Sequence, residues 1–153
     1  MGTVTIAQIC DAIESTLGGA TGMNRVQSYD ELTEGIAAAD LPLLQVYWES
    51  LGIDPGGGTD RTAFRGGLRQ KPFVIHADVY AARRHQLGQD NEALVNIVDA
   101  MIDVIEEQDT KPYFGLAEIK SFSVDSITRS LFLYPDEQNK FVGARFVFTV
   151  WAY

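Results

Sequence analysis

The chain has 153 residues, 46% of them hydrophobic, and its 12 basic and 21 acidic residues give a formal net charge of −9. At this length a folded chain buries roughly 70% of the surface that its unfolded form exposes, so one core suffices for a single domain over residues 1–153. One cysteine excludes an internal disulfide, few soft ligands argue against a bound metal or cofactor, and no stretch is apolar enough to span a membrane. The acidic charge disfavours a duplex-binding surface, so any contact with nucleic acid must be local.

The first expected element is a helix that begins after Thr5. Thr5 and Gln8 have the spacing of a capping box. One apolar face follows at helical spacing, formed by Ile6, Ile9, Cys10, Ile13 and Leu17. Gly18 and Gly19 are expected to end the helix, because glycine readily adopts the left-handed conformation that closes one.

Strands are expected next. A weak signal favours a short strand or edge segment at 25–29, and stronger alternation marks 41–48 and 72–80. In 41–48, Pro42 suits the first strand position, and the core-facing set is Leu44, Val46 and Trp48. In 72–80 the expected core face consists of Phe73, Ile75, Ala77 and Val79.

His76 and Asp78 point to the same side of the strand 72–80, away from its apolar face. A histidine and an aspartate can supply the base and the orienting group of a catalytic triad, and Tyr80 shares their face. The sequence has no nucleophile elbow to complete a hydrolase. We therefore expect that the protein is not an enzyme. The alternative from another functional class is a small α+β enzyme or ligand-binding module that uses His76, Asp78 and Tyr80.

A long segment at about 51–71 separates these two strands and does not resemble core. Its glycines make a regular element costly in backbone entropy, and they match neither a Walker motif nor a dinucleotide fingerprint. Connections this long are usually functional or disordered, so we expect a flexible loop. Its candidate contact residues are three arginines spaced four apart and one aromatic anchor: Arg61, Arg65, Arg69 and Phe64.

A second helix is expected from Asp90, as N-cap, to about Glu107. Its apolar positions are Leu94, Ile97, Val98, Met101, Ile102 and Ile105. Asp99, Asp103 and Glu106 lie together on the opposite face, and without a His or Asn partner they favour a solvated acidic face over a metal site.

The remainder predicts strands at 118–125, 127–134 and 141–153, with a turn at 135–139. The last strand should turn Val142, Ala144, Phe146, Phe148 and Val150 toward the core. The expected fold class is therefore α+β, with an antiparallel or mixed β-sheet, two main helices packed on one face, and a long mobile loop between strands.

Charge is segregated along the chain. Between Arg61 and Arg84 there are six basic residues and one acidic residue, whereas residues 1–60 hold nine acidic residues and only Arg25 as a base. Residues 90–118 hold eight acidic residues and only Lys111. Complementary patches of this kind suit head-to-tail contacts between subunits, which can close into a ring.

The pattern resembles the tail terminator (tail completion) family of long-tailed bacteriophages and related tail-like particles. The resemblance rests on the leading amphipathic helix, the segment 40–46 leading into a strand, the strand 73–80, the helix 92–107, and the closing strand 142–150. It spans most of the chain and includes no catalytic motif. The Gly-rich segment 54–69 departs from the family pattern.

The resemblance implies a structural protein of the virion, located at the junction of head and tail and assembled in the host cytoplasm. Such proteins form a ring, typically a hexamer, that caps the tail tube, ends its polymerisation and presents the surface that joins the head. The implied partners are further copies of the chain, the tail tube protein and a head-side connector protein, with DNA only passing through the ring. We expect Asp99, Asp103 or Glu106 to face that channel, and a head-side connector or stopper ring is the nearest alternative.

Overall fold

The computed structural model describes residues 4–30, 38–51, 71–83, 87–133 and 140–152. They form two α-helices, two short 3₁₀ helices and five strands. The elements in chain order are α1 (Ile6–Leu17), β1 (Arg25–Gln27), η1 (Ala38–Asp40), β2 (Leu43–Leu51), β3 (Lys71–Arg83), α2 (Leu87–Glu106), η2 (Tyr113–Gly115), β4 (Ile119–Leu133) and β5 (Lys140–Ala152).

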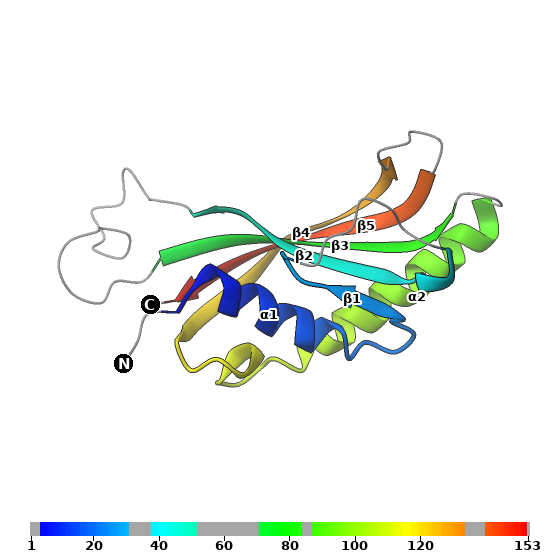
Figure 1. Cartoon of the computed structure of the whole chain (residues 1–153). Coiled ribbons are helices and arrows are strands. Elements are labelled where there is room, and N and C mark those ends of the chain that lie inside the picture. Colours follow the sequence, from blue (N-terminus) through cyan, green and yellow to red (C-terminus); the bar gives the residue numbers. More distant parts are fainter. Residues whose placement is uncertain (1–3, 31–37, 52–70, 84–86, 134–139, 153) are drawn as a thin grey trace.

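The five strands form one mixed sheet in the order β1-β2-β3-β5-β4, in which only the β1–β2 pair is parallel. Both α-helices lie on the same side of this sheet (Figure 1). The predicted α+β class, with a mixed sheet and two helices on one face, is confirmed. The predicted loop at 51–71 joins β2 to β3, and most of it, 52–70, lies outside the described residues.

Helix α1 begins as its sequence predicts. Thr5 Oγ1 accepts a hydrogen bond from the Gln8 amide at 3.2 Å, and Gln8 Oε1 accepts one from the Thr5 amide at 2.8 Å. The predicted left-handed ending is wrong, because Gly18 has a right-handed φ of −62°. Glycine is needed there for space, since a Cβ would lie 3.0 Å from both Val26 Cγ1 and Glu14 O.

The core fills the space between the helices and the three central strands. The predicted core positions of β3 and β5 are all buried, and Ile9, Ile13 and Met101 meet them from the helices with no exposed surface. In β2 the prediction holds for Leu44 and Val46, whereas Trp48 is 44% exposed. Trp48 precedes a β-bulge in the pairing with β3, where the regular register is interrupted.

The sheet face away from the helices is partly covered as well. Leu43, Tyr80 and Phe141 form a second apolar cluster there, and the rings of Tyr80 and Phe141 meet edge to face with centroids 5.8 Å apart. Gln45 lies on the same face of β2 as Leu43, because the two residues are two positions apart in the strand. Gln45 is only 4% exposed and donates a hydrogen bond of 2.9 Å to Gln27 Oε1.

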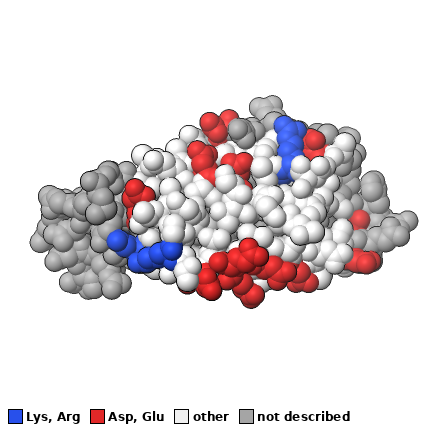
Figure 2. Space-filling model, turned by 90° about the horizontal axis from the view of Figure 1, so that it is seen from below, with Lys and Arg blue, Asp and Glu red and all other residues white. Residues whose placement is uncertain are grey.

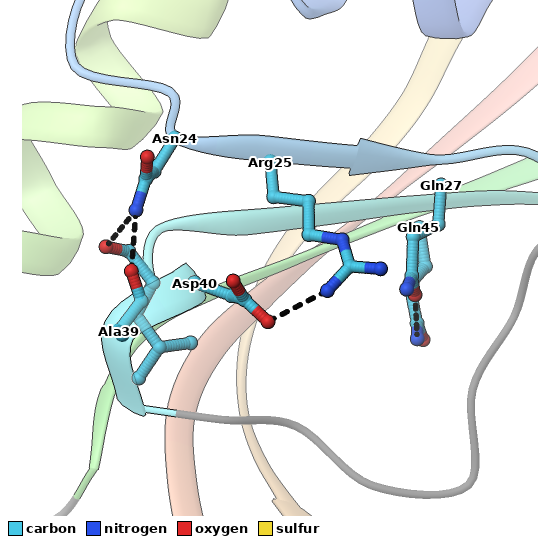
Figure 3. Close-up of polar contacts among 7 residues, drawn as sticks. Asn24, Arg25, Gln27, Ala39, Asp40 and Gln45 are labelled. Carbon is cyan, nitrogen blue, oxygen red and sulfur yellow. Dashed lines mark hydrogen bonds and ion pairs between the residues drawn. The ribbon is translucent and has the colours of Figure 1, made fainter.

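That amide pair helps to hold the short edge strand β1 onto β2 (Figure 3). Two further contacts join the start of β1 to η1, which precedes β2. Arg25 and Asp40 form an ion pair of 2.7 Å, and Asn24 Nδ2 donates a hydrogen bond to the Ala39 carbonyl at 2.6 Å. Side chains therefore supplement a pairing of only three residues, and the predicted short strand at 25–29 is realised as β1.

Strand β4 is one element of 15 residues where two strands were predicted. Its pairing with β5 is irregular between Val124 and Ser126, so the alternation of inward and outward residues shifts by one position. Phe122 lies opposite Val150, and after the bulge Ile127 lies opposite Phe146. A bulge that changes the phase of the pattern makes one bent strand look like two.

Helix α2 begins at Leu87, three residues before the predicted N-cap Asp90. Asp90 instead lies in the first turn of the helix and is 6% exposed. The helix dipole favours an acidic side chain in the first turn, as it does at the N-cap. The predicted apolar face is confirmed, because Leu94, Ile97 and Met101 are buried.

Candidate interaction surfaces

The residues expected to contact a partner fall into two groups. Arg61, Phe64, Arg65 and Arg69 all lie outside the described residues. Asp99, Asp103 and Glu106 are on α2, and each is exposed. Only the acidic group can therefore be placed on the surface.

The acidic face of α2 is defined by Asp99, Asp103 and Glu106. The helix contains no basic residue, and neither ion pair found within the described ranges involves it. In Figure 2 acidic side chains form a row along one edge of the helix-covered side of the molecule. Among the described residues no three His, Cys, Asp or Glu side chains are grouped so that they could hold a metal ion. The face therefore offers unneutralised charge to water or to a basic partner.

An apolar pocket of about 270 Å³ opens between α2 and the edge strand β4. Its lining is mostly apolar and includes one acidic and one basic residue: Leu94, Val95, Val98, Asp99, Ile127, Arg129 and Ala144. Two of its apolar side chains are well exposed, Val95 at 55% and Ile127 at 41%. Arg129 donates a hydrogen bond of 2.9 Å to Asn91 Oδ1 on α2. Nothing in the sequence pattern predicted this pocket.

A polar cluster lies on the sheet face away from the helices and consists of Tyr47, Asp78 and Arg145. The Tyr47 hydroxyl donates to Asp78 Oδ2 at 2.6 Å, and Arg145 donates to the two carboxylate oxygens at 2.8 and 3.0 Å. The Asp78 side chain is 3% exposed and that of Arg145 39%. Burial of Tyr47 and its bond to Asp78 raise the pKa of that hydroxyl, and the bonds to Asp78 raise the pKa of Arg145.

This cluster explains why a strand position in the middle of the sheet is acidic. Asp78 lies opposite Gln45 on one side and Arg145 on the other, so its carboxylate is neutralised across the strand. A buried charge is tolerated when it is paired and hydrogen-bonded in this way. The Asp78–Arg145 pair was not predicted, although two opposite charges at the centres of two apolar strands are a usable signal.

The contacts of Asp78 do not match the role that the enzyme alternative requires of it. Both carboxylate oxygens of Asp78 accept bonds from Tyr47 and Arg145. His76 contacts the Tyr47 ring, edge to face, with centroids 5.5 Å apart, and Tyr80 belongs to the second apolar cluster. Asp78 therefore stabilises the sheet in this structure and is not the orienting partner of His76.

Comparison with known proteins adds no family to this picture. No protein-family model matches the chain, and no curated protein matches it significantly. None of the helices in the described ranges is long and apolar enough to cross a bilayer. The surfaces themselves are therefore the basis for a functional proposal.

Proposed function

We propose that the chain is a structural assembly protein that forms a homo-oligomeric ring, caps a phage tail tube, ends its polymerisation and provides the surface that joins the head. The observation that carries the proposal is the acidic face of α2 beside an open apolar pocket. A charged face without internal partners next to exposed apolar side chains is typical of a contact surface. The basic segment from Arg61 to Arg84 supplies the complementary charge for contacts between copies.

The fold is consistent with this role. One face of the sheet packs on both helices, and strands β2, β3 and β5 bury a continuous core, so the domain can present surfaces on a rigid frame. The resemblance to tail terminators supplies the partners of the proposal: further copies of the chain, the tail tube protein and the head-side connector. A hexamer is the proposed ring, and the virion is the proposed location.

The nearest rival is a head-side connector or stopper ring, which would use the same kind of surface. The two roles differ in the partner, because a terminator acts on the growing tube and a stopper acts on the portal side of the head. No observation favours the enzyme alternative, since Asp78 is engaged by Tyr47 and Arg145.

The test is polymerisation of the tail tube protein from the same source, followed by electron microscopy with and without this chain. A terminator shortens the tubes and leaves a ring at one end. Tubes of unchanged length and without end rings, at a chain concentration that saturates any binding, would refute the role. A variant in which Arg61, Arg65 and Arg69 are changed to Glu is expected to lose capping, and its circular dichroism spectrum serves as the folding control.

A further inference from the structure

The pocket between α2 and β4 occurs where the sheet extends beyond the helix that covers it. Ile127 lies opposite Phe146 in the pairing of β4 with β5, so it is on the core face of the sheet. It is nevertheless 41% exposed, whereas Phe146 is fully buried. Helix α2 contacts β3 and β5 more than the edge strand β4. A core-type position is thereby left open to a partner.

The size and lining of the pocket fit one side chain. Its volume of about 270 Å³ is just below the range of about 300 to 1,000 Å³ typical of small-molecule sites. Its apolar walls, Leu94, Val95, Val98 and Ile127, would take up an aromatic or aliphatic group. Anchor residues that fill such pockets contribute most of the binding energy of protein interfaces.

The charge beside the pocket restricts what the partner can be. Asp99 lines the pocket, and Asp103 and Glu106 continue the same helix face one and two turns further on. From Asp99 to Glu106 the acidic face extends for about 10 Å along the helix axis. The partner segment therefore carries an apolar anchor with basic residues close to it in sequence.

We propose that the occupant is a second copy of this chain, which inserts Phe64 into the pocket and places Arg61, Arg65 and Arg69 against the acidic face of α2. Phe64 is the only aromatic residue of the segment 52–70, and it is next to Arg65. The contact is heterologous, because a pocket on one copy receives a segment of the next, and such contacts generate rings or filaments. The inference rests on the proposed function, since it names the contact that would close the ring. It also assigns Asp99, Asp103 and Glu106 to this interface and not to the channel.

A mixing experiment tests the head-to-tail geometry in the full chain. The variant Val95→Arg has a blocked pocket and an unchanged segment 52–70. The complementary variant has an unchanged pocket and a segment that has lost its anchor and its positive charges: Arg61→Glu/Phe64→Ala/Arg65→Glu/Arg69→Glu. We expect each variant alone to be monomeric, and an equimolar mixture to form a dimer of about 34 kDa, twice the 16.9 kDa chain. The matched control is Asn96→Arg, which adds the same charge at an exposed α2 position outside the pocket and should assemble normally. A mixture that stays monomeric would overturn the proposal.

Cross-linking distinguishes a second copy from the segment of the same chain. In a Phe64→Cys/Ile127→Cys variant, mild oxidation is expected to give a ladder of linked chains, while the buried native Cys10 stays reduced. A disulfide within one chain would overturn the assignment to a second copy. If rings form but the cysteines do not link, the proposed pocket contact is refuted while the proposed ring is retained. The acidic face of α2 is then again expected to line the channel. If the ladder forms but tube growth is not capped, the contact stands and the proposed function fails.

Discussion

Replacing Arg145 by methionine should expose how the polar cluster stabilises the sheet. The carboxylate of Asp78 is 3% exposed and would keep only the hydrogen bond from Tyr47. Removing one partner of a fully buried ion pair costs about 3 to 5 kcal/mol. Because the Arg145 side chain is 39% exposed, water can reach the vacated space and the cost is lower. We expect Arg145→Met to lower the free energy of unfolding by about 2 to 3 kcal/mol.

Removing both charges should cost much less than removing one. In the double variant Asp78→Leu/Arg145→Met no charge remains buried, and we expect it to lie within about 1 kcal/mol of the original chain. The measurement is urea unfolding at pH 7 followed by circular dichroism. Arg129→Met is the matched control, because this exposed arginine makes a single hydrogen bond to Asn91, and it should change stability by less than about 0.5 kcal/mol. Equal losses for Arg145→Met and Arg129→Met would refute the reasoning.

Three further predictions concern local features. Gly18→Ala should cost about 1 to 2 kcal/mol in thermal unfolding, because the new Cβ meets Val26, whereas Gly19→Ala, whose Cβ would lie 3.4 Å from its nearest neighbour, should be nearly neutral. Burial, with a smaller effect of the nearby Asp11 carboxylate, raises the pKa of Cys10 to about 12. A thiol reagent at pH 8 should therefore label Cys10 only after unfolding, and fast labelling of the native chain would contradict this. The pKa of Tyr47 is higher in the folded chain than in the unfolded chain, so its contribution to stability is complete below pH 10 and is lost as the pH rises above 10. Between pH 10 and 11.5 the free energy of unfolding should therefore fall less steeply in Tyr47→Phe than in the original chain.

Periodicity in the sequence predicts much of this fold because each core-facing element repeats its apolar residues at a regular interval. Helix α1 and strands β3 and β5 follow the expected faces, and the capping box at Thr5 forms as predicted. What periodicity misses is any interruption of the interval. The bulge before Ser126 shifts the pattern of β4, and the close approach of Val26 to Gly18 depends on packing between elements.

The surfaces were predictable only where the relevant residues share one element. Asp99, Asp103 and Glu106 are neighbours on one helix, so their spacing alone indicates an exposed acidic face. Asp78 and Arg145 are 67 residues apart and meet only through the pairing of β3 with β5. The pocket beside Ile127 depends on where α2 lies relative to the edge strand, and no local pattern encodes that position.

The most direct test of the ring is the solution mass of the full chain, measured by light scattering after size-exclusion chromatography over a range of protein and salt concentrations. A hexamer of the 16.9 kDa chain has a mass of about 101 kDa, and we expect it to form as protein concentration rises. Added salt should weaken it, because acidic and basic surfaces meet in the proposed contact. A chain that remains a monomer or dimer at every concentration, also with tail tube protein present, would contradict the account.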